Sequence, residues 1–237
     1  MRLMNVIFFD NLPSTNAYAK ENIKNLKHKD IILADTQSEG KGRMQRVWLS
    51  PQGGLYFTIV LKPQNSDVQN LQSLTQAMAL AVCKSIKSQG LQSYIKWPND
   101  VLCEGKKICG ILSLALYDNQ SLSGVLVGTG VNIAKQTLDC GKPAASLQDF
   151  GINIKKEDFL AIVIDNFNAI YEQTLKEGFV AIKQEFKQNF PYLGKDTQIK
   201  MQGKTLTGTV LDLDDHGRLL LKTQSGTEAV AIGDMDF

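Results

Sequence analysis

The 237-residue sequence predicts an α+β fold, with a mixed sheet flanked by helices and a small C-terminal β-barrel. Predicted strands and helices follow one another without a strict βαβ rhythm, and several strands are joined by hairpin turns, which disfavours a doubly wound fold. After Gly194 the pattern changes to four or five short alternating strands in about 40 residues, which is typical of a small antiparallel barrel. We therefore divide the chain into a larger domain, 1–190, and a smaller one, 191–237.

Each element of the larger domain has its own signal. The first helix begins where Ser14, Thr15 or Asn16 can cap its first turn. Pro98 ends one of the strands, and the CEGK sequence at 103–106 predicts the next turn. The predicted strands are short apolar or alternating runs bounded by turn residues: 5–9, 30–37, 53–63, 93–100, 107–117 and 125–133.

Two further segments, 68–87 and 157–187, are predicted helices. In both, apolar residues recur every three or four positions, so each helix has one apolar face. We interpret these faces as core rather than as binding surfaces. Their residues are Leu71, Leu74, Met78, Ala81, Val82 and Ile86 in the first segment, and Phe159, Leu160, Val163, Ile164, Phe167, Ile170 and Tyr171 in the second.

The charge composition excludes one broad class of function. Lys and Arg total 26 and Asp and Glu total 24, so the formal net charge is only +2. A dedicated nucleic-acid binder normally carries a clustered basic excess, and we expect no nucleic-acid partner here. No stretch approaches the roughly 20 apolar residues of a membrane span, and the N-terminus does not match a signal peptide, which predicts a cytoplasmic protein without a membrane partner.

Cysteine and histidine usage excludes several catalytic classes. In a cytosolic protein the four cysteines are expected to be free buried thiols, and there is no Cys-x-x-Cys pair. His28 and His216 lie far apart in sequence, in polar segments. We therefore expect no structural metal site and no Ser-His or Cys-His catalytic pair. Lysine, arginine and backbone amides must carry any chemistry. The cysteines are Cys83, Cys103, Cys109 and Cys140.

The segment GKGRMQRVW at 40–48 is the first candidate for a functional site. Its glycines let backbone N–H groups approach an anion, and Lys41, Arg43 and Arg46 add charged donors. It matches neither the Walker A loop nor the dinucleotide-binding Gly-x-Gly-x-x-Gly pattern. A solvated basic turn is the alternative interpretation of this segment alone.

Three other motifs are individually ambiguous. KWPNDVL offers the Asn99 amide and a carboxylate at the end of a strand, or is a plain Pro-Asn turn. In KICGI, strand alternation places Lys107 on the face of Cys109 and Ile111, where a buried lysine needs an anion; a snorkelling edge lysine is the alternative. GTGVNI permits close approach of a flat ligand such as a base beside Asn132, or is a twisted strand with a capping Asn.

Taken in order, these motifs resemble the biotin protein ligases from about residue 7 to the end of the chain. The segments that carry the resemblance are STN, ADTQSEGKGRMQRVW, GGLYFTIVL, KWPNDV, KKICGIL and GTGVNI. The resemblance implies a mixed sheet related to class II aminoacyl-tRNA synthetases and an SH3-like C-terminal domain. Because VIFFDNLPSTN already belongs to the catalytic pattern, it also implies the short form without an N-terminal DNA-binding domain.

The resemblance also implies roles for individual residues. Lys107 and Arg43 would be catalytic, with Lys107 meeting the biotin carboxylate and the α-phosphate. Two departures stand in the basic loop, where Lys41 replaces a usual Arg and Gln45 a usual Gly. The implied biotin-binding residues are Ser14, Thr15, Asn16, Gln37, Lys41, Gly42, Arg43 and Lys107, and the implied ATP-binding residues are Gly40, Arg46, Trp48, Lys96, Asn99 and Asn132.

The implied activity is ATP-dependent formation of biotinyl-5′-AMP and transfer of biotin to a lysine of a biotin carboxyl carrier protein. ATP and biotin are then substrates, Mg²⁺ accompanies ATP with no protein metal ligands assigned, and a homodimer is possible. Two alternatives stay open at this point. One is a lipoate or octanoyl transferase, which is similar in fold, and the other is a non-enzymatic module that uses the C-terminal barrel for protein contact.

Overall fold

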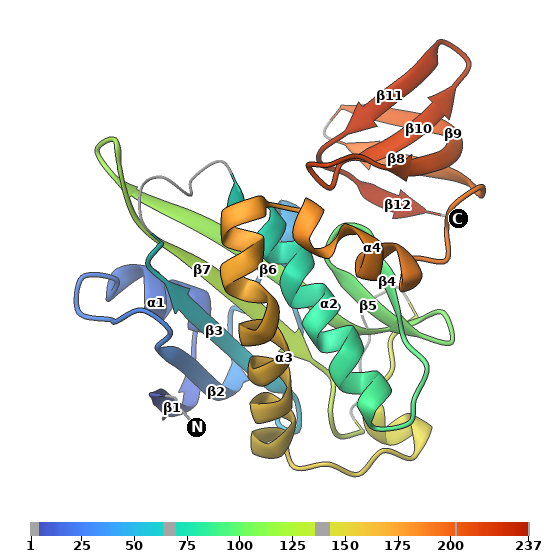
Figure 1. Cartoon of the computed structure of the whole chain (residues 1–237). Helices are drawn as coiled ribbons and strands as arrows, with labels where there is room; N and C mark the ends of the chain where they lie inside the picture. The colour runs from blue at the N-terminus through green and yellow to red at the C-terminus, as the bar shows by residue number, and fades with distance from the viewer. Residues whose placement is uncertain (1–4, 64–69, 136–142, 202, 237) are drawn as a thin grey trace.

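The computed structural model describes residues 5–63, 70–135, 143–201 and 203–236, and Figure 1 shows their arrangement. The larger of two sheets has seven strands in the order β1-β2-β3-β7-β6-β5-β4. Strands β1 and β2 run parallel and the other neighbours antiparallel, which confirms the predicted mixed sheet. The strands are β1 (Val6–Leu12), β2 (Ile31–Gln37), β3 (Leu55–Leu61), β4 (Tyr94–Lys96), β5 (Asp100–Cys103), β6 (Lys106–Asp118) and β7 (Ser121–Val131).

Two long helices, α2 (Ser73–Ser88) and α3 (Lys156–Glu177), lie side by side on one face of this sheet (Figure 1). The segment predicted as one helical run at 157–187 is in fact two helices, because α3 ends at Gly178 and α4 (Val180–Gln188) follows. Gly178 has a φ of 71°, which glycine adopts without a Cβ penalty and which ends the helix. The predicted apolar faces form the main core, with only Ile170 partly exposed in the second.

The opposite face of the sheet is covered in part by the short helix α1 (Thr15–Glu21). The Ser14 hydroxyl caps this helix by accepting a hydrogen bond from the Ala17 N–H, so the predicted cap position is confirmed. A second, smaller apolar cluster lies under α1 and includes Leu12, Ala19, Leu26, Ile32, Ala34, Val60 and Leu126. Because the strand residues alternate between the two clusters, both faces of the central strands are buried.

The C-terminal sheet has five antiparallel strands in the order β11-β10-β9-β8-β12, as the alternating pattern predicts. Among residues 196–236, position 202 apart, the end strands β11 and β12 are not paired with each other, so backbone hydrogen bonds leave the predicted barrel unclosed. The strands are β8 (Asp196–Met201), β9 (Lys204–Leu213), β10 (Leu219–Thr223), β11 (Gly226–Val230) and β12 (Asp234–Asp236).

The C-terminal sheet contacts the larger domain through its β9–β10 turn. The carbonyl of Gly217 accepts hydrogen bonds from the Trp97 indole at 2.9 Å and from the Gln76 amide at 2.8 Å, and both contacts are buried. Two ion pairs flank them, Lys183–Asp215 and Lys187–Asp212, each at 2.7 Å. The sequence element KWPND therefore contacts both parts of the chain.

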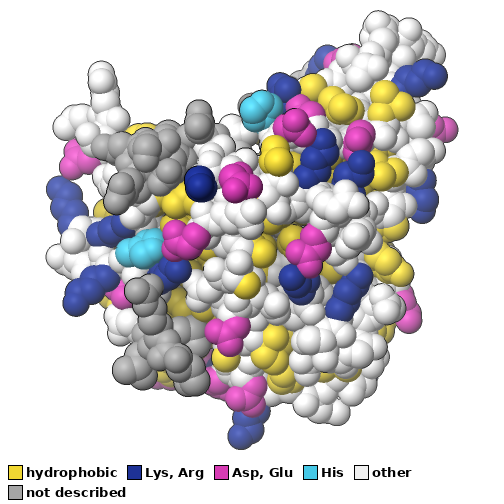
Figure 2. Space-filling view, viewed as in Figure 1, with side chains coloured by type: hydrophobic (Ala, Val, Ile, Leu, Met, Phe, Trp, Pro, Cys, Tyr) yellow, Lys and Arg dark blue, Asp and Glu magenta, His cyan; other side chains and the backbone are white. Residues whose placement is uncertain are grey.

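Charges of both signs are interspersed on the face shown in Figure 2, in keeping with the small net charge. Cys83, Cys103 and Cys109 are free and buried, as predicted, whereas Cys140 lies outside the described residues. Burial raises the pKa of the Cys103 thiol to about 12. Over the described ranges we find neither a helix of the length and apolarity needed to cross a membrane nor a cluster of three or more metal-ligating side chains.

Candidate active site

The basic segment 40–48 forms a small hairpin rather than an open loop. The Gly42 N–H donates to the Arg46 carbonyl at 2.8 Å, and the Trp48 N–H donates to the Gly40 carbonyl at 2.9 Å. Lys41 and Val47 form a β-bridge between the two arms. The backbone pairing of the two arms therefore closes a tight turn from Arg43 to Arg46.

The turn at the hairpin tip has an unusual backbone. The Arg46 N–H donates to the Arg43 carbonyl at 3.2 Å, and the two residues between them, Met44 and Gln45, have φ values of 54° and 59°. Positive φ at both central positions is the signature of a type I′ hairpin turn, which usually contains Asn and Gly. The turn places Arg43 and Arg46 at its two ends.

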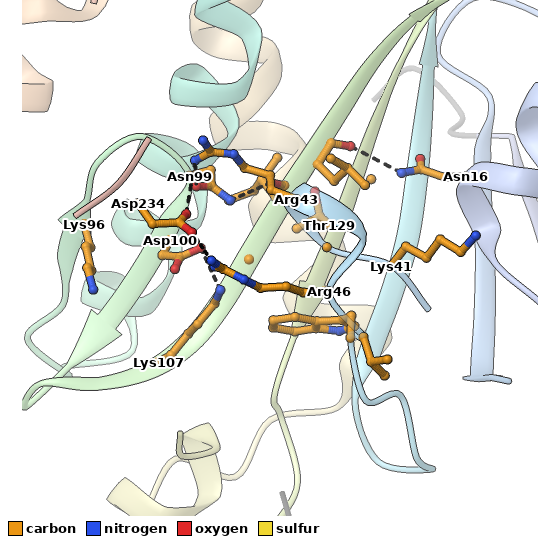
Figure 3. Close-up of a pocket in the computed structure, with 18 of the residues that line it drawn as sticks. Asn16, Lys41, Arg43, Arg46, Lys96, Asn99, Asp100, Lys107, Thr129 and Asp234 are labelled. Carbon is orange, nitrogen blue, oxygen red and sulfur yellow. Dashed lines mark hydrogen bonds and ion pairs between the residues drawn. The ribbon is translucent and has the colours of Figure 1, made fainter. Parts of the chain in front are cut away.

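Arg43 is anchored at two points far apart in sequence. One guanidinium nitrogen donates to the Asn99 side-chain oxygen at 2.8 Å and another to the Gly233 carbonyl at 3.2 Å, while Asp234 lies 4.0 Å away (Figure 3). Burial lowers the pKa of Arg43, an effect partly opposed by the charges of Asp234 and Asp100. A guanidinium stays protonated despite such a shift, so Arg43 is a fixed, partly desolvated cation.

The other cations of the site are also paired with carboxylates. Lys107 forms an ion pair with Asp100 at 2.7 Å, and Arg46 forms one with Asp234. Lys107 also lies over the Trp48 ring, 5.2 Å from its centroid, within the range of a cation–π contact. Figure 3 shows Arg43, Arg46 and Lys107 gathered around the two carboxylates.

Lys107 faces the site, but not on the predicted face of its strand. Lys107 pairs with Leu102 and Cys109 with Val101, so the strand contains one extra residue, a β-bulge, at Ile108. The bulge places the Lys107 amine near Gly110, while Cys109 is fully buried in the core. The prediction that Lys107, Cys109 and Ile111 share a face is therefore wrong, because strict alternation fails at a bulge.

The glycines of β6 and β7 make room for side chains of the protein itself. A Cβ on Gly130 would lie 2.3 Å from the Trp48 indole nitrogen, and one on Gly110 would lie 2.9 Å from the same ring. The sequence predicts close approach of a flat ligand at GTGVNI, whereas the flat group seated on Gly130 is Trp48. Its indole nitrogen is buried and, among the described residues, has no hydrogen-bond partner.

A hydrogen-bonded network of hydroxyls and amides lies at the other end of the site. The Gln37 side-chain oxygen accepts from the Thr15 N–H at 2.9 Å and from its hydroxyl at 3.2 Å. The Thr58 hydroxyl lies 2.9 Å from both the Thr15 hydroxyl and the Asn16 side-chain oxygen. Gly128 leaves space for Asn16, since a Cβ there would lie 2.3 Å from the Asn16 amide nitrogen.

One cavity of about 430 Å³ joins the polar network to the cations. It contains 12 of the predicted site residues, from five separate stretches of the chain. These residues are Ser14, Thr15, Asn16, Gln37, Lys41, Gly42, Arg43, Arg46, Trp48, Lys96, Asn99 and Lys107.

Comparison with known proteins identifies the family of this chain. Residues 8–132 match the biotin/lipoate A/B protein ligase family, and 192–237 match the biotin protein ligase C terminal domain. A biotin–[acetyl-CoA-carboxylase] ligase of Paracoccus denitrificans is 30% identical over 94% of this chain and 97% of its own length. The chain belongs to the biotin protein ligase family.

Two other biotin protein ligase relatives span nearly the whole chain. The bifunctional ligase/repressor BirA of Bacillus spizizenii is 32% identical over 98% of this chain and 74% of its own length. The structure of the Aquifex aeolicus biotin protein ligase, in complex with biotin and ATP, matches with a TM-score of 0.86 and 26% identity, covering 99% of this chain and 98% of that one. These matches confirm the predicted family and fold.

Two predicted site residues of this biotin protein ligase family member lie outside the cavity lining. Asn132 is buried, and its amide donates to the carbonyls of Ala145, at 3.1 Å, and Lys107, at 3.4 Å. These bonds tie it to β6 and to the segment after residue 142, and its role toward adenine stays a prediction. Gly40 begins the hairpin, and a Cβ there would lie 2.4 Å from the Trp48 carbonyl of the opposite arm.

The site also contains residues that the sequence analysis does not assign. Asp100 follows Asn99 directly, so its carboxylate was visible in the sequence. Thr58 is the one polar residue in the apolar run LYFTIVL, which was also a usable signal. No signal in the sequence indicated Asp234, because it contacts Arg43 and Arg46 from a strand about 190 residues further along the chain.

Lys41 and Lys96 line the cavity but stand apart from the cation cluster. Figure 3 shows the Lys41 side chain directed away from Arg43 and Lys107, so the Lys-for-Arg departure at this position affects the edge of the site. Lys96 lies 3.9 Å from Asp236 of the C-terminal sheet.

Proposed function

We propose that this chain is an ATP-dependent ligase that activates biotin as biotinyl-5′-AMP and transfers it to a specific lysine of a biotin carboxyl carrier protein. One observation carries the proposal: a single cavity has a neutral hydrogen-bonding end and a cationic end. The Thr15, Gln37 and Asn16 groups suit the ureido ring of biotin, which both donates and accepts hydrogen bonds. Arg43, Arg46 and Lys107 suit a carboxylate and phosphates.

The first step brings two anions together. A carboxylate oxygen of biotin attacks the α-phosphorus of ATP, the bond to the β-phosphate oxygen breaks, and pyrophosphate leaves. At about 4 Å, two unit charges repel by roughly 4 kcal/mol at an effective dielectric constant of 20. A fixed cation between them removes this repulsion and stabilises the charge that develops on the phosphate oxygens. In this proposal Lys107 and Arg43 would take this role.

In the second step the amine of the acceptor lysine attacks the carbonyl carbon of the mixed anhydride. An amide bond forms, AMP leaves with the bonding electron pair, and the amine loses a proton. No covalent enzyme intermediate is needed, so positioning accounts for the catalysis. The hairpin 40–48 would cover the anhydride and limit its hydrolysis.

Mg²⁺ would accompany ATP in this reaction. The cavity offers two carboxylates, Asp100 and Asp234, and the described part of the chain holds no cluster of three or more metal-ligating side chains. This donor set fits Mg²⁺, which usually keeps several waters and binds through one or two carboxylates and the substrate phosphates. Asp100 would be the protein's ligand, and the metal would supply charge neutralisation when bound.

Several finer assignments belong to the same proposal. The acceptor would be a carrier domain of a biotin-dependent carboxylase, which the name of the Paracoccus denitrificans relative supports. The roles of the individual site residues, the domain division near residue 190, homodimer formation and a cytoplasmic location stay predictions.

The direct test is to incubate the pure protein with ATP, Mg²⁺ and biotin and to look for biotinyl-5′-AMP by mass spectrometry. Addition of a carrier domain should then give one biotinylated lysine and release AMP. Lipoate and octanoate must be tested in parallel, because the matched family includes lipoate ligases. Adenylation of lipoate but not biotin would overturn the proposal, and absence of ATP–pyrophosphate exchange with every acid would favour a non-enzymatic binding module.

A further inference from the structure

The tip of the hairpin 40–48 is unfavourable in two ways when considered alone. Met44 and Gln45 both adopt left-handed backbone conformations, which cost an L-residue free energy relative to glycine. Arg43 and Arg46 stand at the two ends of the same tight turn, and like charges placed opposite each other across a hairpin destabilise it. Some other part of the molecule must therefore stabilise this closed shape.

The compensating contacts come from the first residue of strand β12, Asp234, and from Gly233 just before it. The Asp234 carboxylate pairs with Arg46 and lies 4.0 Å from Arg43. The Gly233 carbonyl, next to it, accepts the 3.2 Å hydrogen bond from Arg43. One carboxylate thus stands between two arginines that would otherwise repel each other, and one carbonyl fixes the guanidinium that points into the cavity.

Burial makes this contact different from an ordinary surface ion pair. The side chains of Asp234 and Arg43 are only 16% and 17% exposed. A carboxylate in such surroundings is costly without a partner, and in the described residues its ion-pair partners are Arg43 and Arg46. By contrast, the ion pair of Asp212 and Lys187 joins β9 of the C-terminal sheet to helix α4, but these side chains are 37% and 29% exposed and lie away from the cavity.

We propose that Asp234 is a positioning residue of the active site: the C-terminal sheet holds the hairpin tip closed and fixes Arg43 and Arg46 for the adenylate. The inference deepens the proposed function and, for its catalytic consequence, rests on it. The C-terminal sheet is then a part of the active site, and it acts through the two arginines rather than by contact with the reacting atoms.

The first experiment measures hairpin closure without any substrate. Trypsin cleaves after Arg43 and Arg46 only when the tip opens, and its rate follows the population of the open form. Loss of a charge-assisted contact worth about 1.5 kcal/mol or more should raise cleavage at these sites roughly tenfold in Asp234→Asn. Asp212→Asn, which removes an ion pair between the C-terminal sheet and helix α4 of the larger domain, should leave it unchanged.

The same digest distinguishes opening of the hairpin tip alone from detachment of the whole C-terminal sheet. Lys195 is exposed and lies just before β8, so cleavage there reports on the connection between the two parts of the chain. It should stay at the wild-type rate in Asp234→Asn. The proposal would be overturned if trypsin cleaved wild type and Asp234→Asn after Arg43 and Arg46 at the same rate. It would also be overturned if cleavage after Lys195 rose in Asp234→Asn by the same factor as cleavage after Arg43 and Arg46. Both outcomes would count even if the protein proved not to be a biotin ligase.

The second experiment asks whether Asp234 acts through the arginines. Wild type must first form biotinyl-5′-AMP, which tests the proposed function separately. Asp234→Asn should then shorten the half-life of the enzyme–adenylate complex roughly tenfold, raise KM for ATP more than it lowers kcat, and be partly rescued by Asp234→Glu. In a protein that already carries Arg43→Gln and Arg46→Gln, Asp234→Asn should add no further loss. A full additional loss in that background would show an independent role and overturn the inference.

Discussion

The two ends of the cavity are organised by different physical means. At the polar end, Thr15, Asn16, Gln37 and Thr58 satisfy one another through neutral hydrogen bonds of 2.9–3.2 Å, and they come from α1 and two adjacent strands. At the cationic end, each positive group is held by a carboxylate or carbonyl from another part of the chain. The first end is organised by neutral hydrogen bonds, whereas the second is a balance of charges.

This difference predicts how each end responds to substrate. A neutral, satisfied network on packed elements changes little on binding, so substitutions there should alter affinity for one substrate. An anionic ligand entering the other end changes the partners of Arg43, Arg46 and Lys107, so substitutions there should alter the chemistry and the retention of the intermediate. Substitutions at each end of the cavity test this contrast.

Lys107→Ala should have the largest effect. It removes a cation at the meeting point of two anions, and loss of one such electrostatic contact costs about 10²- to 10³-fold in rate. The measurement is biotin-dependent ATP–pyrophosphate exchange, with circular dichroism to show that the fold is intact. Lys106→Ala is the matched control, because Lys106 is the neighbour of Lys107 on the same strand and is exposed. Near-normal exchange by folded Lys107→Ala would remove Lys107 from the mechanism.

Arg43→Gly should affect retention more than formation of the adenylate. The lost contact to phosphate is worth about 1.5–3 kcal/mol, so biotinyl-5′-AMP should be held roughly ten- to a hundredfold more weakly. Lys107 still allows some adenylate to form, and the released anhydride should label lysines on unrelated proteins. The measurement is carrier biotinylation per adenylate formed, alongside labelling of serum albumin.

Arg43→Lys is the informative control for this prediction. It keeps the charge but not the two-pronged geometry that reaches Asn99 and Gly233. We expect Arg43→Lys to retain biotinyl-5′-AMP less tightly than wild type and more tightly than Arg43→Gly. Wild-type retention by Arg43→Gly would mean that Arg43 does not hold the adenylate.

The glycines allow the same small change to be made at each end. In Gly128→Ala the new methyl group would collide with Asn16, which should raise KM for biotin about tenfold, since overpacking costs roughly 1–3 kcal/mol. In Gly110→Ala it would meet Trp48 and the Lys107 amine, which should lower the rate of adenylation instead. The measurement is steady-state kinetics with each substrate varied. A rise of KM for ATP alone in Gly128→Ala would contradict the division of the cavity.

The sequence predicts most of the fold because its signals are local. The strand alternation, the Ser14 cap and the apolar faces of α2 and α3 each depend on residues within a few positions of one another. The predicted helix over 157–187 fails at Gly178, where one glycine with positive φ ends α3 although the apolar pattern continues. Barrel closure at the C-terminus depends on pairing between distant strands, which no local pattern specifies.

Site residues that lie in continuous motifs were predictable, whereas residues whose positions depend on tertiary contacts were not. The bulge at Ile108 turns Lys107 to the other face of its strand, and no residue type in KICGI signals a bulge. The Asn132 amide donates to carbonyls that only the folded chain brings near it. Asp234 meets the hairpin through the packing of two sheets, so its role appears only in three dimensions.

Gln45→Gly should have the smallest effect and separates backbone strain from charge at the cationic end. Gln45 has a φ of 59°, and the left-handed conformation costs about 1–2 kcal/mol for a residue with a Cβ. Glycine removes this cost but adds about 0.5–1 kcal/mol of unfolded-state entropy, so the net gain in stability should be about 1 kcal/mol or less. For a chain of this size that raises Tm by at most roughly 4 °C, measured by thermal unfolding. Val47→Gly, in an arm of the same hairpin and outside the positive-φ positions, should lower Tm instead. If both variants lose the same stability, the turn carries no strain at Gln45, and its closed shape depends on the arginine contacts alone.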